Sequence, residues 1–344
     1  MSTSAQEQIG VRRARAFVCV LVCSLATLAL HGIGAVSRAQ SPSQQAAAQE
    51  ESQRPIRVEV GLVSLFATVR DSSRRLVPAL AKEDFRVYED GAEQRLEYFS
   101  RETALPITLG MLIDTSISQQ AVLALEQEAG ARFLRRVLRA GDLSFVISFD
   151  VNIDLLGDHT GDTEQLEAAL GRARINAPVD LGPIERRGPV GTALFDAVYL
   201  ACREKLAREA GRKAVVILTD GVDAGSKVTL QQALETAQRS DTVIYVIGVS
   251  DPHYYGGIGV TAGGEGVARK LAEETGGRAI FVRSEKKLEE AFDEIAEELR
   301  TQYTLGYYPT NRARDGKFRK VKIETRQKGM KVQARKGYYA SRAN

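Results

Sequence analysis

Between Ile107 and Gln302, continuous apolar runs alternate with longer amphipathic stretches. The apolar runs have strand length: ITLGMLID, LSFVISFD, KAVVILTD, TVIYVIGV and RAIFV. The amphipathic stretches have helical periodicity and cover Gln119–Arg139, Thr163–Arg174, Thr192–Arg208, Thr229–Arg239, Val267–Thr275 and Lys286–Gln302. Strands that are apolar on both faces and separated by helices predict an α/β fold, a doubly wound and mostly parallel sheet. The short segment VNIDLL, directly after LSFVISFD, predicts an antiparallel edge strand.

Both flanks of this α/β region (105–302) have β character. Residues 55–102 contain IRVEVGLVSLFATVRD, whose start alternates apolar and polar residues, and DFRVYEDGAEQRLEYFS, which predicts two short strands around an Asp90-Gly91 turn. Residues 303–341 contain YTLGYYPT, KFRKVKIETR and MKVQARKGYYA. We expect these N- and C-terminal β segments to form one small β-domain, into which the α/β domain is inserted.

The N-terminus predicts export. Three arginines within residues 12–15 precede an apolar run over residues 16–36, and residues 37–39 (Ser-Arg-Ala) offer the small residues that a signal peptidase reads. We therefore expect a signal peptide over 1–39, and we favour cleavage over a retained N-terminal membrane anchor. Residues 40–54 are rich in Gln, Ala, Ser and Glu and predict a disordered linker. The mature protein is then periplasmic or secreted.

Composition excludes few functions. The formal net charge is +3, too small to indicate a nucleic-acid partner. Basic residues gather in the C-terminal β segment, where Lys320 and Lys322 alternate with Val321 and Ile323. We interpret them as the wet face of a strand, with contact to an anionic envelope as the alternative. Beyond the signal peptide the only cysteine is Cys202, which we expect to be a buried small hydrophobe rather than a reactive thiol.

Oxygen-bearing side chains gather where the apolar strands end. ITLGMLIDTSISQQ ends its strand with Asp114, followed by Ser116 and Ser118, and KAVVILTD ends with Asp220. Sites in a doubly wound sheet form outside the carboxyl ends of its strands, so we expect both carboxylates in one crevice if the two strands are neighbours. We expect an extended loop to turn Asp114, Ser116 and Ser118 towards one point. GPVGTALFD brings Thr192, which we also expect to begin a helix.

These five side chains offer two carboxylates and three hydroxyls, with neither His nor Cys. Donors that are all oxygen suit a hard cation. Several neutral donors suit six-coordinate Mg²⁺ better than a Ca²⁺ cage, with Mn²⁺ or Ca²⁺ as alternatives.

The motifs DTSIS, Gly191-Thr192 and LTDG resemble the metal-ion-dependent adhesion site of von Willebrand factor type A domains. The resemblance implies that a divalent cation is held by Asp114, Ser116, Ser118, Thr192 and Asp220, with Asp220 often acting through water. It also implies an open metal position that accepts a carboxylate from a protein partner. Ile117 stands where the family usually has Gly, and a β-branched residue cannot easily take positive φ.

A narrower resemblance covers nearly everything from residue 56 onward. KEDFRVYEDGAEQ, LAEETGGR and QYTLGYYPT look like a bacterial exported subfamily, the "VWFA-related" proteins common in Acidobacteria. The function implied is a non-enzymatic, divalent-cation-dependent adhesion or assembly module that binds a protein partner through an acidic residue. Two alternatives stay open: a metal-assisted hydrolase in the same crevice, and a structural module with an idle site.

Two weaker signals favour ordinary loops. GGIGVTAGG (256–264) contains a G-x-G-x-x-A pattern, but the segment DPHYY separates it from the preceding strand, so we expect a surface loop rather than a dinucleotide site. We expect His159 and His253 to lie in exposed loops, because no triad spacing supports a catalytic role.

Overall fold

The computed structural model describes residues 61–101, 105–175, 191–249 and 261–342. The chain divides into two compact units, Met1–Glu59 and Val60–Asn344, and the described residues belong to the second. The predicted signal peptide and linker therefore lie outside them. No helix within the described ranges is long and apolar enough to cross a bilayer.

The α/β region forms one six-stranded sheet with the order β10-β9-β8-β5-β6-β7. Its strands, in chain order, are β5 (Ile107–Asp114), β6 (Leu143–Phe149), β7 (Ile153–Thr160), β8 (Arg212–Thr219), β9 (Thr242–Val249) and β10 (Ala279–Val282). All neighbours pair in parallel except β7, which runs antiparallel to β6 at the edge. The predicted doubly wound sheet and its antiparallel edge strand are confirmed.

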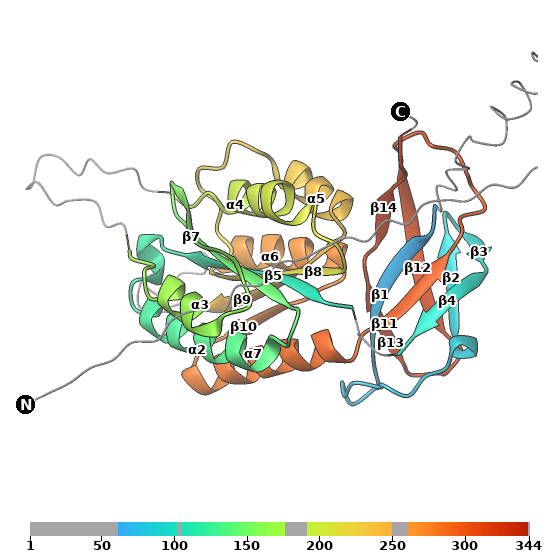
Figure 1. Ribbon diagram of the computed structural model, residues 1–344, viewed down its shortest axis with the longest axis horizontal. Coiled ribbons are helices and arrows are strands. Elements are labelled where there is room, and N and C mark those ends of the chain that lie inside the picture. The colour runs from blue at the N-terminus through green and yellow to red at the C-terminus, as the bar shows by residue number, and fades with distance from the viewer. Residues whose placement is uncertain (1–60, 102–104, 176–190, 250–260, 343–344) are drawn as a thin grey trace, which may run out of the picture. The chain divides into compact units, whose positions relative to one another are not determined.

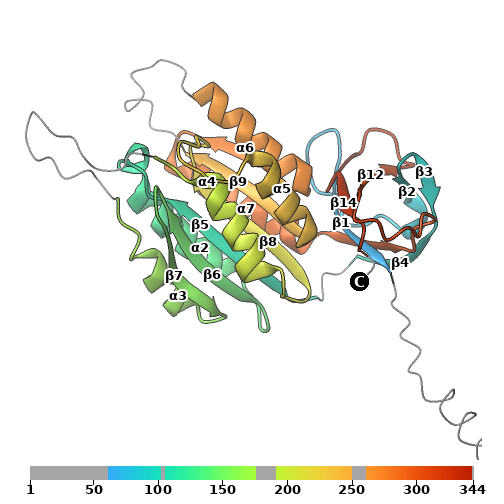
Figure 2. The same cartoon turned by 90° about the horizontal axis from the view of Figure 1, so that it is seen from above.

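Helices cover both faces of this sheet, as Figures 1 and 2 show. One face carries α2 (Leu123–Val137), α3 (Thr163–Leu170) and α7 (Glu285–Arg300). The other carries α4 (Leu194–Leu200) with the π-helical turn η3 (Ala201–Leu206), α5 (Leu230–Arg239) and α6 (Thr261–Thr275).

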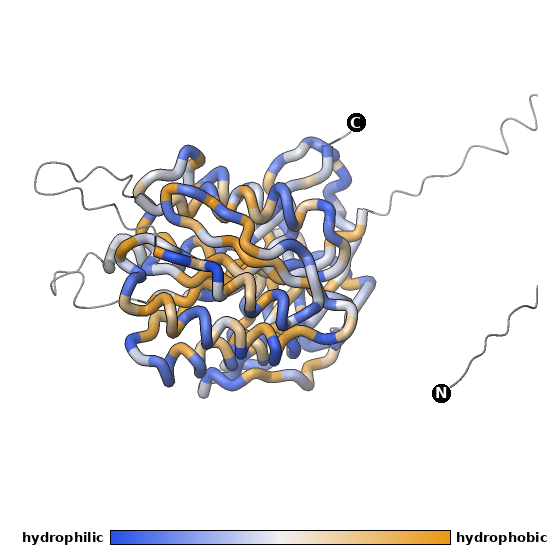
Figure 3. Tube along the Cα trace, turned by 60° about the vertical axis from the view of Figure 1, so that its left-hand side comes forward, coloured by the Kyte–Doolittle hydropathy of each residue, from blue (hydrophilic) through white to orange (hydrophobic). Residues whose placement is uncertain are grey.

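Successive strand residues serve opposite faces of the sheet. On β5, Met111 and Ile113 pack into the core under α2 and α7, whereas Leu112 between them packs into the core under α4 and α5. Because each core needs an apolar side chain from every second position, the strands read as continuous hydrophobic runs. In Figure 3, which colours the chain by hydropathy, hydrophobic segments run through the body of the structure.

The two β flanks fold together as two four-stranded antiparallel sheets, each built from both ends of the chain. The first has the order β13-β1-β11-β4, and the second β14-β12-β2-β3. Their N-terminal strands are β1 (Val63–Arg70), β2 (Phe85–Glu89), β3 (Ala92–Gln94) and β4 (Leu96–Ser100). Their C-terminal strands are β11 (Tyr303–Tyr307), β12 (Phe318–Thr325), β13 (Lys331–Ala334) and β14 (Gly337–Tyr339). One apolar core holds them together, which confirms the predicted composite β-domain.

Two details of the flanks refine the prediction. DFRVYEDGAEQRLEYFS forms three strands rather than two, because Asp90 and Gly91 take positive φ in the turn between β2 and β3, and β4 then pairs in the other sheet. On β12 the expected alternation holds: Lys320 and Lys322 are exposed and Val321 is buried.

The prediction of a loop over residues 256–264 is wrong for its last four residues. Helix α6 begins at Thr261 instead of Val267, and the earlier part of that segment lies outside the described residues. Glycine disfavours a helix by about 1 kcal/mol relative to alanine, so the sequence pattern masked this helical turn.

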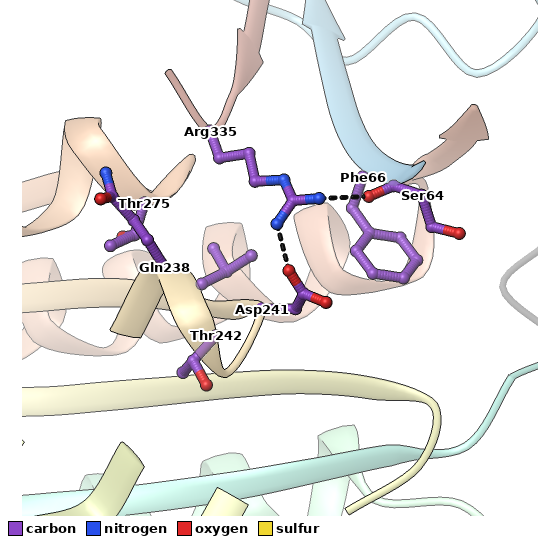
Figure 4. Close-up of a pocket in the computed structure, with 8 residues that line it drawn as sticks. Ser64, Phe66, Gln238, Asp241, Thr242, Thr275 and Arg335 are labelled. Atoms are coloured by element: carbon purple, nitrogen blue, oxygen red, sulfur yellow. Dashed lines mark hydrogen bonds and ion pairs between the residues drawn. The ribbon is translucent and has the colours of Figure 1, made fainter. Parts of the chain in front are cut away.

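Charged contacts join the α/β region to the β flanks. Arg335, which follows β13, pairs with Asp241 before β9 and donates to the backbone oxygen of Ser64 at 2.7 Å. Figure 4 shows this pair at a small pocket that Phe66 also lines. On α7, the fully buried Glu298 accepts from further arginines and a glutamine: Arg70, Arg278 and Gln333.

Candidate metal centre

The candidate site lies at the carboxyl edge of the central sheet, where β5 and β8 end side by side. Their register pairs Ile113 with Leu218, so Asp114 lies level with Thr219, and Asp220 is the next residue on the neighbouring parallel strand. Asp114 is fully buried and Asp220 is only 5 % exposed. The expectation that these strands are neighbours is confirmed, and it places both carboxylates at one edge.

Asp114 accepts hydrogen bonds from the loop that follows it and from the end of β8. Its Oδ1 accepts a hydrogen bond from the Ser116 backbone N–H at 2.9 Å, and its Oδ2 accepts from the Thr219 hydroxyl at 2.6 Å. The Ser116 and Ser118 hydroxyl oxygens lie 3.0 Å apart. Asp114, Ser116 and Ser118 thus form one connected group. Thr219, the last residue of β8, belongs to the same group and was not predicted from the sequence.

The DTSIS loop is not extended throughout. Ser116 is extended, with φ −66° and ψ 159°, but Ile117–Gln119 form a 3₁₀ turn. The expected extended loop is therefore wrong beyond Ser116, and the turn is what brings Ser118 back towards Ser116. Among the described residues only Arg74, Asp90 and Asp241 take positive φ without being glycine, so Ile117 is accommodated without the conformation that β-branched residues avoid.

Thr192 lies on a turn that is tied to the other site loops. Its carbonyl accepts from the Ala224 N–H at 2.9 Å, in the loop that follows Asp220, and its side chain is buried. Gly191 approaches the same loop so closely that a Cβ there would lie 2.5 Å from the Ala224 oxygen. The turn therefore needs glycine before Thr192, and it sets Thr192 beside the loop that carries Asp220.

Asp150, which directly follows β6, joins the DTSIS loop and the loop that carries Thr192 at this edge. Its carboxylate accepts from the Thr115 hydroxyl at 3.1 Å, and its backbone oxygen accepts from the Ala193 N–H at 2.6 Å. Asp150 was not predicted as a site residue, although it follows an apolar strand much as Asp114 ends one. Its place at the end of an apolar strand is the sequence signal that could have identified Asp150.

Thr192 does not cap helix α4 as expected. The N-cap position is Ala193, which provides no side-chain hydrogen bond. The helix is capped instead from the loop after β8: Asp223 Oδ1 accepts from the Phe195 N–H at 3.2 Å, and the Ser226 hydroxyl accepts from the same N–H at 3.0 Å.

The N-terminal part of α6 packs directly on the backbone that follows β8. Gly221 takes a positive φ of 83°, and a Cβ there would lie 2.4 Å from the Gly264 oxygen. A Cβ on Gly264 would lie 2.6 Å from the Asp220 oxygen. Glycine on both sides of this contact allows the helix to support the loop that carries Asp220.

The electrostatics of the edge favour a cation. Burial raises the pKa of Asp114 to about 7, and the negative charge of Asp220 raises it too, against hydrogen bonds from Ser116 and Thr219. Burial also raises the pKa of Glu126 on α2 well above its usual value, with smaller contributions from Asp114 and Asp220. In addition, the buried side-chain oxygens of Gln119 and Glu126 accept no hydrogen bond from any described residue.

An excess of buried acceptor oxygens over donors is what a bound cation would balance, so the residues present fit a divalent ion. The described residues contain no group of three or more His, Cys, Asp or Glu side chains placed to hold a metal. The donor set is therefore mixed, with hydroxyls beside the carboxylates, and it matches the all-oxygen set expected for a hard cation.

Other predicted candidates lie away from this edge. Cys202 is a free, fully buried cysteine in η3, so the expectation of a buried small hydrophobe is confirmed, and burial raises the pKa of its thiol to about 12. His159 does not lie in an exposed loop: it lies on β7, with its ring against Phe145 and its Nδ1 3.0 Å from Asp158. His253 lies outside the described residues.

A family model described as von Willebrand factor type A domain matches residues 181–294. This part of the chain is therefore similar to von Willebrand factor type A domains. The match includes Thr192 and Asp220, but it begins after Asp114, Ser116 and Ser118. Domains of this type are mostly non-catalytic binding modules, often used in adhesion or pilus assembly. No curated protein matches the chain.

Solved structures with a similar fold share little sequence with this domain. The conserved hypothetical protein BatB from Bacteroides thetaiotaomicron is 18% identical, with a TM-score of 0.43, and the match covers 56% of this chain and 98% of that one. The vWF domain of the type V pili tip protein Mfa5 from Porphyromonas gingivalis is 16% identical, with a TM-score of 0.44, over 56% and 94%.

A third similar structure contains a metal. Proximal thread matrix protein 1 from the mussel byssus, with a zinc-occupied MIDAS motif, is 16% identical with a TM-score of 0.47. The match covers 62% of this chain and 50% of that one, so this chain spans only half of the byssus protein.

Proposed function

We propose that this chain is an exported, divalent-cation-dependent protein-binding module that captures an acidic residue of its partner at the carboxyl edge of its von Willebrand factor type A domain. One observation carries the proposal. Asp114, Ser116 and Ser118 form a hydrogen-bonded group at the end of β5, and the loops with Thr192 and Asp220 are fastened to the same edge.

The proposed ligands are the five predicted residues: Asp114, Ser116, Ser118, Thr192 and Asp220. Bound there, a divalent cation would supply a positive centre for a partner carboxylate. If Asp220 acts through water, most of the direct donors are neutral hydroxyls. These side chains then neutralise little of the ion's charge, and the remaining charge favours a further anionic ligand. The hydroxyl-rich set suits Mg²⁺, with Mn²⁺ or Ca²⁺ as alternatives.

Export is part of the same proposal. It is supported by the arginine-led apolar run over residues 16–36 and by the small residues at 37–39. The narrower resemblance to exported bacterial "VWFA-related" proteins agrees with it. Expression in a bacterial host with a cell envelope, followed by fractionation and mass measurement, tests both export and cleavage after Ala39. A full-length protein in the cytoplasm would contradict them.

The metal site is tested by titration calorimetry with Mg²⁺ and Mn²⁺. The protein is expected to bind one ion, and Asp114→Ala is expected to abolish binding while the fold persists, because crowded carboxylates repel each other without a cation. Asp293→Ala is the matched control, since Asp293 is an exposed α7 residue paired with Arg136. Equal binding by the protein and by Asp114→Ala would reject the site assignment.

Partner capture is tested by affinity pull-down from envelope extract, in Mg²⁺ and in chelator. Partners that are retained only with Mg²⁺, and lost with Asp114→Ala, support the proposal. Partners that bind equally well in chelator would favour a structural module with an idle site.

A further inference from the structure

A glutamate occupies the core-facing side of helix α2. The buried residues of this helix follow helical spacing and are otherwise apolar or small: Leu123, Ala129, Gly130, Ala131, Phe133, Leu134 and Val137. Glu126 lies on the same side and is 0% exposed. A carboxylate is rarely fully buried unless it is paired, so a glutamate here needs a physical reason.

Nothing in the described part of the chain satisfies this carboxylate. Neither Oε1 nor Oε2 of Glu126 accepts a hydrogen bond there, and no arginine or lysine pairs with it. Gln119 is in a similar position: its side chain is 1% exposed and its Oε1 is also without a donor, although its Nε2 donates to the Ser118 hydroxyl at 3.4 Å. An unsatisfied buried acceptor costs about 1–3 kcal/mol, and a charged one costs more.

Both unsatisfied groups belong to the surroundings of the candidate metal site. Gln119 follows Ser118 directly and contacts its hydroxyl. Glu126 lies in the first turn of α2, which begins just after the DTSIS loop. Burial is the main cause that raises its pKa, and the negative charges of Asp114 and Asp220 are close enough to raise it further. Two buried acceptors that have no donor among the described residues therefore border the proposed ligands.

We infer that Glu126 and Gln119 form an outer acceptor shell of the metal site and take hydrogen bonds from water molecules that the bound cation retains. The inference rests on the proposed metal-dependent function and adds two residues that the DTSIS, Gly191-Thr192 and LTDG motifs do not contain. Outer groups of this kind orient the inner ligands and adjust the affinity of a site for its ion.

The outer shell determines which ion the site prefers. Mg²⁺ gives up its water reluctantly and is usually bound by one or two carboxylates together with several waters. Ca²⁺ takes six to eight oxygen ligands in flexible geometry and depends less on retained water. A buried anionic acceptor that is reached only through water therefore favours Mg²⁺ over Ca²⁺.

Titration calorimetry on the full chain tests the inference, with Glu126→Gln as the main variant. This change keeps the shape of the side chain and removes its charge. It is expected to weaken Mg²⁺ binding about 10–100-fold, and to weaken Ca²⁺ binding less. The matched control is Glu128→Gln, which removes the same charge from an exposed residue of the same helix and should bind Mg²⁺ as the unaltered protein does.

Thermal unfolding gives a second readout. In metal-free buffer, Glu126→Gln is expected to melt no lower than the unaltered protein, since it replaces a buried carboxyl that is costly to ionise with a neutral side chain of the same shape, and to gain less on addition of Mg²⁺. If this variant fails to fold, Gln119→Ala tests the same shell and should weaken Mg²⁺ binding several-fold.

The outcomes separate this inference from the proposed function. Absence of Mg²⁺ binding by the unaltered protein would reject both. Normal binding by the unaltered protein, its loss in Asp114→Ala, and unchanged Mg²⁺ affinity in Glu126→Gln would reject the outer shell alone. An equal loss of Mg²⁺ and Ca²⁺ affinity in Glu126→Gln would overturn its role in ion preference.

Discussion

Asp114 makes the metal-free protein sensitive to pH. Its pKa rises from an ordinary value of 3.8 to about 7, first through burial and then through the charge of Asp220, against hydrogen bonds that lower it. Between these two values the folded protein holds a proton that the unfolded chain has released. This contribution to stability is therefore complete below about pH 4 and is lost as the pH rises to about 7.

Urea unfolding in metal-free buffer, between pH 4.5 and 7.5, measures this contribution. We expect the free energy of unfolding to fall more steeply with rising pH in the unaltered protein than in Asp114→Asn. One pKa unit corresponds to about 1.4 kcal/mol, so the difference between the two curves is on the order of 4 kcal/mol at most. If the free energy of unfolding changes with pH in the same way in both proteins, Asp114 ionises normally. Any pH dependence that remains in Asp114→Asn would come in part from Glu126.

Residues at the site differ in how readily the sequence indicates them. Asp114, Ser116 and Asp220 follow apolar strands, and the ends of parallel strands share an edge, so pattern alone placed them. Thr219 and Asp150 were missed because their roles depend on hydrogen bonds between different strands and loops, which no local pattern contains. Glu126 did leave a signal, a charge on the apolar stripe of a helix, but an acidic residue in a helical segment is ordinarily solvated.

At the scale of elements, α4 depends on a loop from elsewhere in the chain. Ser226 accepts hydrogen bonds from two α4 N–H groups, those of Phe195 and Asp196, and donates to Asp223. Removal of a capping side chain typically costs about 1 kcal/mol. We therefore expect Ser226→Ala to lower the free energy of unfolding in chelator by about that amount.

Thr192→Ala is the informative comparison, because it precedes the same helix without capping it. It should destabilise the metal-free protein less than Ser226→Ala, yet weaken Mg²⁺-dependent partner binding by about 1–3 kcal/mol. Normal partner affinity for Thr192→Ala at saturating Mg²⁺ would remove Thr192 from the ligand set.

Helix α6 also supports the site, through glycines that the sequence analysis took for a loop. A Cβ on Gly264 would collide with the Asp220 backbone, whereas a Cβ on Gly263 would meet nothing within 4 Å. We expect Gly264→Ala to cost about 1–3 kcal/mol of stability and to weaken Mg²⁺ binding. Gly263→Ala should be neutral or stabilising by up to about 1 kcal/mol, since alanine favours helix. Thermal melts and titration calorimetry compare the stability and the Mg²⁺ affinity of the two variants. Equal values for both variants would exclude the close contact between Gly264 and the Asp220 backbone.

The sequence predicted the strands of the central sheet but not the start of α6 or the number of strands over residues 84–100. Strand positions were correct because a strand buried on both faces needs an unbroken apolar run. The start of α6 was wrong because its glycines are selected by a contact between distant parts of the chain, and that contact overrides their low helix propensity. The division of residues 84–100 into three strands was missed for a similar reason, since β4 pairs with β11 more than 200 residues later.

At the scale of the whole molecule, the two flanks cannot form their sheets separately. β11 lies between β1 and β4 in one sheet, and β12 lies between β14 and β2 in the other. The shared core combines Leu65 and Val87 from the N-terminal flank with Tyr303 and Leu305 from the C-terminal flank. Glu298 on α7 adds contacts to Arg70 on β1 and Gln333 on β13. The α/β domain thus interrupts a β-domain whose halves need each other.

A chain that ends at Gln302 tests this dependence. It lacks β11, so β1 and β4 lose their common neighbour, and it lacks β12, so β2 and β3 remain as an isolated pair that is marginal in water. We expect backbone amides of residues 63–100 to lose their protection from hydrogen exchange, while amides of the central strands β5 and β8 keep theirs. The unaltered full-length chain is the control. Unchanged protection over residues 63–100, together with one cooperative melt, would show that the N-terminal strands fold without the C-terminal ones. Loss of protection throughout both regions would instead mean that the α/β domain also depends on the composite β-domain, through contacts such as those of Glu298.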